Sequence, residues 1–416
     1  MGQKAKTMND VDEKSLKYVV LGACCAAIFW PGTLIFGFPG VMSQHWQMVF
    51  KVGPSEVGQI LFFILAPVGL FMFFIGRLLE RWKPQWLIGI GALICFGSTT
   101  LLPLAESFTG VYLWAFVMGS STAMIYLSGL TVVQRWFPER RGLVSGVFNM
   151  FFGGSAALLS PVYNRLLAAL GYHWVSMGAA TCVLIFGLIS AALIRFPLPH
   201  NVYGSERSAD TPKIFLLSMT VVESMKTRSF WMLWFTWAFA GAAGISMITL
   251  STAFGKARGL APHEAVLLLT AFNITNGISR VISGYASDYI GRRMTLTLSF
   301  MAAGAAYFFM ARTGSLSIWL ALSAVIGYGF GTLFSVSAPL VGDCFGMDHF
   351  GAILGMIFTA YGFVSGIIGP WLSGQLLDIT SGNFAAIFTY LGALMLSAAG
   401  MIQLARPQTE CILPVR

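Results

Sequence analysis

Twelve stretches of about 20 mostly apolar residues run through the chain, and each is long enough to cross a bilayer as a helix. In lipid, backbone polar groups must be satisfied within the segment itself, so all twelve are predicted to be helices. The first six are residues 17–41, 57–75, 86–105, 111–133, 142–167 and 174–194. The second six are residues 230–254, 265–286, 294–310, 316–341, 352–372 and 385–404. We therefore expect an all-α membrane protein.

The composition agrees with a chain that is surrounded by lipid. Of the 416 residues, 56% are hydrophobic and only 10% are charged, whereas soluble domains carry roughly 25% charged residues. An ordinary soluble globular fold is therefore excluded. The net charge of +9 is not gathered in long basic runs, which argues against a nucleic-acid partner.

The chain divides into two similar halves. We expect an N-terminal six-helix bundle over residues 1–194, a polar cytoplasmic linker over 195–229 and a C-terminal six-helix bundle over 230–416. An internal repeat supports this division, because residues 76–81 match residues 284–288, which begin 208 positions later, half the length of the 416-residue chain. Residues 137–146 and 345–355 form a second pair with almost the same offset.

Basic residues are distributed unevenly between the two ends of the predicted bundles. Of the 25 lysines and arginines, 19 fall on the side of the N-terminus and five on the opposite side. Because Lys and Arg accumulate in cytoplasmic loops, both termini are expected in the cytoplasm. The prediction is a multi-pass protein of the plasma or inner cell membrane.

The one remaining basic residue, Arg280, lies inside the eighth span. It precedes Asp288 by eight residues, which at ~1.5 Å per residue places it about 12 Å from the cytoplasmic end. A charge at that depth costs roughly 3 kcal/mol or more and is tolerated mainly beside a cavity or a partner. No Asp or Glu lies clearly inside any span, so the partner is expected to come from solution. A guanidinium stays protonated and matches a carboxylate, which predicts a small organic anion as ligand.

Other polar and aromatic side chains inside the spans are candidates for the same site. Asn276 lies one helical turn before Arg280 and Asn273 two turns before, so both share its face, although either could instead bond a neighbouring helix. The remaining candidates, each of which could also serve only in packing, are Tyr126, Asn149, Phe330, Phe334, Phe358 and Tyr361.

Nothing in the sequence supports an enzyme. All five histidines fall in loops or at span ends, and the glycine, serine and histidine motifs of hydrolases, zinc proteases, P-loop and dinucleotide-binding proteins do not occur. The six cysteines show no metal-binding spacing and are expected to be small apolar fillers. We predict no catalytic residue, no metal and no cofactor.

Several motifs resemble those of known transporters. Gly76-xxx-Glu80-Arg81 and Gly284-xxx-Asp288, the latter followed by Gly291-Arg292-Arg293, resemble the signature loops of the major facilitator superfamily. Within that superfamily, three segments are similar to the monocarboxylate transporter family, close to bacterial lactate transporters, and to the related oxalate:formate antiporters: Arg135-Trp-Phe-Pro-Glu-Arg-Arg-Gly142, Asn276-xxx-Arg280 and Phe330-Gly-Thr-Leu-Phe334.

The resemblance implies a secondary transporter of small monocarboxylates such as L-lactate or pyruvate. The anion would move together with a proton while the two bundles rock about a central site. Arg280 matches the family's substrate-binding arginine, and the monomer is the expected functional unit. The resemblance also implies a latch that holds the bundles in an outward-open state, formed by Gly76, Glu80, Arg81, Gly284, Asp288, Arg292 and Arg293.

The chain departs from the family pattern at its proton-handling positions. The family often has an aspartate where this chain has Asn276, and a lysine in the first span, where this chain has only apolar residues and Thr33. Any coupled proton would need another carrier, for which the candidates at span boundaries are Glu106, Asp288, Asp343 and Asp378. Two alternatives stay open: an organic-anion exchanger of the oxalate/formate type, and a membrane sensor that binds a carboxylate without moving it.

Overall fold

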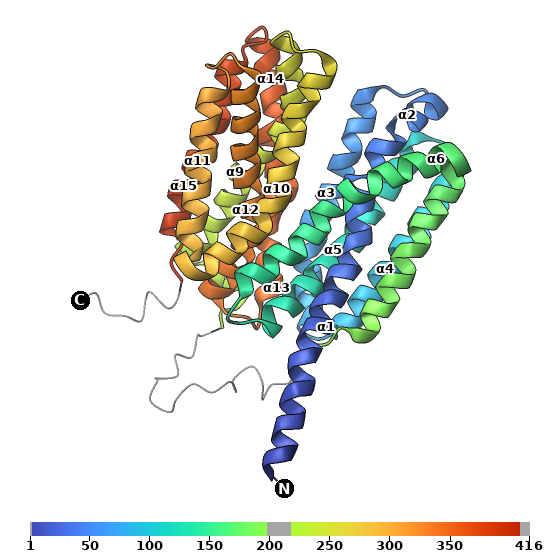
Figure 1. The fold of residues 1–416 in the computed structure, drawn as a ribbon, viewed down its shortest axis with the longest axis vertical. Helices are drawn as coiled ribbons and strands as arrows, with labels where there is room; N and C mark the ends of the chain where they lie inside the picture. Colours follow the sequence, from blue (N-terminus) through green and yellow to red (C-terminus); the bar gives the residue numbers. More distant parts are fainter. Residues whose placement is uncertain (1, 198–217, 408–416) are drawn as a thin grey trace, which may run out of the picture.

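The computed structural model describes residues 2–197 and 218–407, and it is built from helices without a strand in these ranges (Figure 1). This confirms the predicted all-α architecture. The middle of the predicted linker, residues 198–217, lies outside the described residues. The helices form two bundles, one from each half of the sequence, that stand side by side (Figure 1).

The N-terminal bundle contains six α-helices and one short 3₁₀ turn. They are α1 (Gly2–Phe36), α2 (Phe38–Phe50), α3 (Pro54–Leu79), α4 (Pro84–Leu101), η1 (Leu102–Leu104), α5 (Phe108–Trp136) and α6 (Arg141–Leu193). The long α6 bends at Gly171, whose φ of 79° is non-helical, and it packs against α1 and α4.

The C-terminal bundle follows the short helix α8 (Val221–Met225), which lies within the predicted linker. Its elements are α9 (Arg228–Ala257), α10 (Pro262–Ile290), α11 (Arg292–Met310), α12 (Leu316–Phe345), α13 (Phe350–Thr359), the π-helical turns η2 (Ala360–Ser365) and η3 (Ile367–Trp371), α14 (Leu372–Ile379) and α15 (Phe384–Leu404). Helices α13 to α14 together cover the eleventh predicted span.

Every predicted span falls on a helix of the structure. Ten helices in the described part of the chain are long and apolar enough to cross a membrane. One of them, α6, covers two predicted spans, and its backbone is kinked between them at Gly171, where φ and ψ are non-helical. The ninth predicted span corresponds to α11, which is outside the ten and begins with two arginines, Arg292 and Arg293.

The two most extensive helix contacts between the bundles are those of α6 with α10 and of α3 with α13. Both contacts depend on glycine. A methyl group at Gly142 would collide with the carbonyl oxygen of Gly284, and one at Gly76 would collide with the backbone of Gly351 and Ala352. Small residues let helix backbones approach closely in membranes. The repeated motifs therefore meet across the bundles. Residues 76–81 pack against residues 345–355, and residues 137–146 pack against residues 284–288.

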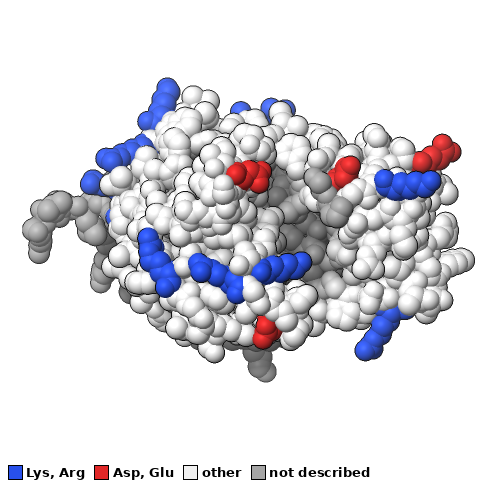
Figure 2. Space-filling view, turned by 90° about the horizontal axis from the view of Figure 1, so that it is seen from above, with Lys and Arg blue, Asp and Glu red and all other residues white. Residues whose placement is uncertain are grey.

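The bundles are joined at the end where the linker begins and ends. Arg135 of the N-terminal bundle donates through Nη2 to the backbone carbonyl of Met347 in the C-terminal bundle, 2.9 Å away. Seen from the opposite end, the molecule is hollowed between the two bundles (Figure 2). The structure is thus closed at the linker end and has a recess that opens at the far end.

Candidate functional site

Arg280 lies within α10, where that helix crosses α6 of the other bundle. Its side chain is buried, with only 4% of its surface exposed, and it is the one charged residue among the buried residues of the described chain. The two helices approach so closely that a methyl group at Gly146 would collide with the Arg280 carbonyl oxygen, and a methyl at Gly153 would lie 2.5 Å from Nη1. Glycine on α6 thus makes room for the guanidinium.

The guanidinium has polar and aromatic neighbours but no carboxylate partner among the residues that the structure describes. Nη1 donates to the backbone carbonyl of Asn149 at 2.7 Å, and Nη2 lies 3.4 Å from Asn276 Oδ1. The guanidinium carbon stands 4.9 Å from the ring centre of Phe334, a cation–π distance. Arg280 Nε is buried and has no hydrogen-bond acceptor within the described residues. Within residues 2–197 and 218–407, the positive charge is therefore stabilised by a backbone carbonyl, an amide oxygen and an aromatic face.

Asn149 on α6 connects the two bundles beside Arg280. Besides the carbonyl that accepts from Arg280, its side-chain Nδ2 donates to the Phe334 carbonyl at 3.2 Å, and its Oδ1 accepts from the Tyr126 hydroxyl at 2.9 Å. Tyr126 is on α5 of the same bundle. This network fixes the side chains of Tyr126 and Asn149 against the arginine.

Aromatic rings surround the guanidinium from both bundles. Phe334 contacts Tyr361 at 5.4 Å between ring centres, and Phe358 at 6.4 Å. Tyr126 reaches Phe358 across the bundles at 6.3 Å. We call Tyr126, Phe334, Phe358 and Tyr361 the aromatic cage. All four were singled out in the sequence, and the structure brings them together around Arg280.

The other sequence candidates lie at the edge of this group. Phe330 stacks on Phe272, with ring centres 5.8 Å apart, and its ring packs against Gly244. It also contacts Phe334, with ring centres 5.3 Å apart, and so supports that residue. Asn276 is partly exposed one turn from Arg280, while Asn273 is exposed. Thr33 of α1 forms a hydrogen bond with the Tyr163 hydroxyl at 2.7 Å, inside its own bundle.

Sequence reasoning missed two members of the site. Trp237 on α9 is buried, and its ring lies 5.1 Å from Phe334 and 4.6 Å from Phe358. A signal for it exists, because tryptophan normally sits at the membrane interfaces and Trp237 falls well inside a span. The second is Gly153. Nothing in the sequence around Gly153 points to the site, because its role depends on its closeness to Arg280, which lies on another helix.

Two π-helical turns shape the cage on the side of α13. Tyr361 lies in η2, and so does Ser365, whose Oγ donates to the backbone carbonyls of Trp237 and Ala238 at 3.1 and 3.0 Å. π-Helical turns within α-helices are frequent at functional sites because the wider turn displaces side chains. Here the turn ties η2 to α9 and sets the position of both Tyr361 and Trp237.

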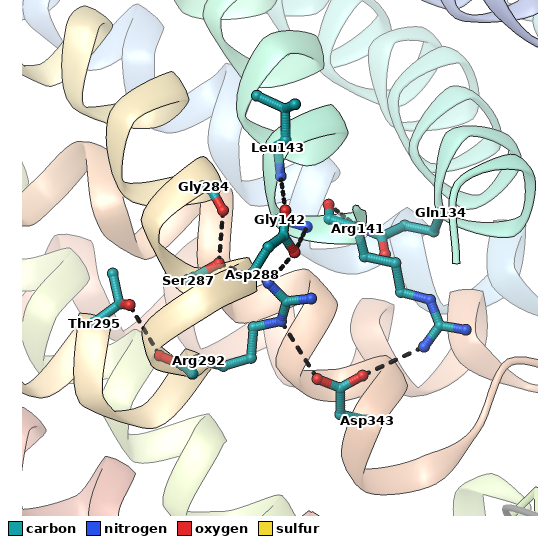
Figure 3. A network of polar contacts seen from close by, with 11 residues as sticks. Gln134, Arg141, Gly142, Leu143, Gly284, Ser287, Asp288, Arg292, Thr295 and Asp343 are labelled. Atoms are coloured by element: carbon teal, nitrogen blue, oxygen red, sulfur yellow. Dashed lines mark hydrogen bonds and ion pairs between the residues drawn. The ribbon is translucent and has the colours of Figure 1, made fainter. Parts of the chain in front are cut away.

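At the linker end, Asp288 of α10 contacts the other bundle (Figure 3). Its carboxylate accepts from the backbone N–H groups of Gly142 and Leu143, each at 2.9 Å. These are unpaired N–H groups of the first turn of α6, where the helix dipole also favours a negative charge. Asp288 is thus an N-terminal cap supplied by the opposite half.

Ion pairs extend this contact (Figure 3). Arg292 pairs with Asp288 and, through Nε, lies 3.4 Å from Asp343. Asp343 also pairs with Arg141 of the other bundle at 3.3 Å. A second crossing is the pair of Glu80 on α3 with His349, 2.8 Å apart. Gly76, Glu80, Gly284, Asp288 and Arg292 thus all lie at contacts where the bundles meet.

Two residues predicted for the latch occupy other places. Arg293 donates to the carbonyl and the side chain of Gln403 at 2.6 and 3.2 Å, inside its own bundle. Arg81 is exposed and makes no ion pair within the ranges that the structure describes. Of the boundary acids, Asp288 and Asp343 belong to the ion-pair network, whereas Glu106 and Asp378 are exposed.

Comparison with known proteins places the chain among transporters. The curated relatives include the oxalate:formate antiporter of Oxalobacter formigenes, 23% identical over 76% of this chain and 74% of that protein. Monocarboxylate transporter 13 of Rattus norvegicus is 24% identical over 90% of this chain and 86% of that protein. Among solved structures, the transporter FucP in the outward conformation has a TM-score of 0.73 at 14% identity, covering 94% of this chain and 99% of FucP.

These comparisons agree with the described fold. The model of the Major Facilitator Superfamily matches residues 19–261 and 238–410. The chain is therefore a membrane transporter and not an enzyme. With its two helical bundles, its inter-bundle glycine contacts and a family match over most of its length, the chain belongs to the Major Facilitator Superfamily.

Proposed function

We propose that this transporter carries small monocarboxylates, L-lactate, pyruvate or similar anions, with a proton, by alternating access around Arg280. The observation that carries the proposal is a buried guanidinium without a carboxylate partner in the described chain. Leaving a buried charge uncompensated is costly. An incoming carboxylate supplies the missing negative charge and accepts hydrogen bonds in the planar geometry that a guanidinium offers.

The cage sets limits on the ligand. One buried cation suits one negative charge, because a second carboxylate would enter a low-dielectric site without compensation. The aromatic cage and the backbone at Gly153 border the guanidinium closely, which favours a short molecule. One chain supplies every residue of this site, so we propose the monomer as the functional unit.

The inter-bundle contacts at the linker end support the alternating-access part of the proposal. The contacts of Gly76, Glu80, Gly284, Asp288 and Arg292 would act as the latch that keeps the linker end closed. Transport would require this latch to open while the recess at the far end closes. With most basic residues at the end of the termini, the recess would face the exterior of a plasma or inner membrane, and the termini the cytoplasm.

A second candidate, exchange of one organic anion for another, is favoured by the same uncompensated charge. The empty carrier would have to reorient with an unpaired buried cation, whereas the loaded carrier would be neutral at that point. Arg280 itself holds its proton at working pH, so it does not supply a coupled proton. Among the boundary acids, Asp343 is placed between Arg141 and Arg292, where a change of protonation would alter the latch.

Uptake of labelled L-lactate and pyruvate into proteoliposomes tests the proposal. Uptake is measured with and without an inward proton gradient, for the native protein, Arg280→Lys and Arg280→Gln. Arg165→Gln is the matched control, because Arg165 lies exposed on α6. Gradient-driven uptake that is lost in both Arg280 variants and kept in the control is the expected result. Uptake that ignores the gradient but is accelerated by anion inside the vesicle would support exchange, and native uptake that survives Arg280→Gln would overturn the role of Arg280.

A further inference from the structure

The indole N–H of Trp237 is an unused hydrogen-bond donor. Four tryptophans are buried in the described part of the chain. Three of them donate within the protein: Trp46 to Tyr172 at 2.9 Å, Trp114 to Thr99 at 3.1 Å and Trp319 to the carbonyl of Thr313 at 3.1 Å. Trp237 Nε1 has no acceptor among the described residues, although only 1% of the residue is exposed.

This donor belongs to the same group of side chains as Arg280. The Trp237 ring contacts Phe334, Phe358 and Tyr361, with ring centres 5.1, 4.6 and 5.6 Å apart. Phe334 in turn carries the guanidinium of Arg280 on its face. Two buried donor atoms without an acceptor among the described residues, Arg280 Nε and Trp237 Nε1, therefore belong to side chains that both contact Phe334.

Contacts with η2 hold the position of Trp237 on α9. Its backbone carbonyl accepts from Ser365 Oγ, and Gly241, one turn further along α9, packs against Ser365 and Tyr361. A buried N–H without a partner destabilises the folded protein, and most buried polar groups in proteins are satisfied. A phenylalanine would fill a similar space without that cost, so the unsatisfied N–H points to an acceptor that arrives with the ligand.

We propose that Trp237 is a second recognition residue, which donates a hydrogen bond to the neutral 2-oxo or 2-hydroxy oxygen next to the carboxylate of the transported anion. This inference rests on the proposed function of Arg280. The carboxylate pairs with Arg280, and the carbonyl or hydroxyl oxygen on the next carbon accepts from Trp237. A neutral acceptor fits better than a second carboxylate, because the indole is uncharged and the site holds one cation.

The test compares acids of similar size that differ in the second acceptor. KM is measured in proteoliposomes for pyruvate, L-lactate and propionate, with the native protein, Trp237→Phe and Trp234→Phe. Trp234 is the matched control, since it is on the same helix but donates to Thr359 Oγ1 at 3.1 Å. The native protein should prefer pyruvate and lactate over propionate by about fivefold or more, as expected for one hydrogen bond. Trp237→Phe should bring this ratio close to one, and Trp234→Phe should keep it.

A second variant keeps the shape of the indole. Replacing Trp237 by benzothienylalanine removes the N–H and leaves a bicyclic ring, so a loss of the preference there cannot come from a packing defect. The inference would be overturned if the native protein had equal KM values for propionate and pyruvate. It would also be overturned if Trp237→Phe changed all three KM values by the same factor. Both results leave Arg280-dependent uptake in place, whereas failure of the proposed function would appear as uptake that does not depend on Arg280.

Discussion

Arg280 of the C-terminal bundle donates a hydrogen bond to the backbone carbonyl of Asn149 in the N-terminal bundle, with Nη1 and the oxygen 2.7 Å apart. The residue proposed to bind the substrate is therefore itself a contact between the two bundles. A carboxylate that draws the guanidinium toward itself would compete with this contact. Ligand binding and the mutual position of the bundles are thus linked through one side chain.

Gly153→Ala should strongly reduce transport, although the substitution replaces no charged residue. The added methyl group would lie 2.5 Å from Arg280 Nη1 and would displace the guanidinium. A misplacement of this kind commonly costs about 100-fold in activity. Gly154→Ala is the control, because a methyl there meets nothing within 4 Å. Initial rates of uptake in proteoliposomes decide the matter, and equal rates for the two variants would contradict the described packing around Arg280.

Asn276→Asp should make transport strongly dependent on pH. The new carboxylate would stand where Asn276 Oδ1 now lies 3.4 Å from Arg280 Nη2, and it would neutralise the guanidinium while ionised. Substrate binding would then weaken at neutral pH and recover as acidification protonates the aspartate. KM measured between pH 5 and pH 8 should fall with falling pH more steeply than in the native protein. A parallel profile for both proteins would show that position 276 does not act on Arg280.

Asp288→Asn should favour opening at the linker end. The carboxylate caps α6 through two backbone N–H groups and pairs with Arg292, and its side chain is only 6% exposed. Loss of such a cap costs about 1 kcal/mol, which shifts a two-state equilibrium about fivefold. Spin labels at the exposed positions Lys83 and Tyr289, on a cysteine-free background, report the distance between the bundles. A larger open population than in the Asp378→Asn control is expected, and an unchanged distance distribution would contradict a latch at Asp288.

His349→Ala should have the same direction and a smaller effect. The His349–Glu80 pair spans 2.8 Å between the bundles, but its side chains are 28% and 22% exposed. Partly exposed pairs contribute roughly 0.2–1 kcal/mol. The same distance measurement should show a slight increase of the open state, below that of Asp288→Asn. An effect larger than that of Asp288→Asn would mean that the α3–α13 contact, rather than the α6–α10 contact, holds the closed end.

The fold could be predicted because lipid imposes a strong rule on the sequence. Twelve apolar segments sufficed to predict an all-helical membrane protein, and each of these segments falls on a helix of the structure. The kink at Gly171 falls where the sequence predicts a break, between the spans 142–167 and 174–194. The placement of Arg293 beside Gln403 could not be predicted from the sequence, because a basic residue at a helix end can contact any of several neighbouring groups.

The site was only partly predictable for a related reason. Spacing along one helix shows which residues share a face, so Asn276 and Arg280 could be paired from the sequence. Which faces of different helices meet is decided by packing, and this brought Asn149, Gly153 and Trp237 to the arginine. The aromatic cage was named residue by residue, but the support role of Phe330 against Phe272 and Gly244 required the structure.

Binding of L-lactate and pyruvate to the purified protein, measured by isothermal titration calorimetry, tests the central claim most directly because it separates recognition from transport. The native protein and the control Arg165→Gln should bind, whereas Arg280→Gln should bind at least about tenfold more weakly, as expected for the loss of a charged hydrogen-bond donor. Equal affinities for the native protein and Arg280→Gln would contradict the claim that the buried guanidinium of Arg280 holds the carboxylate.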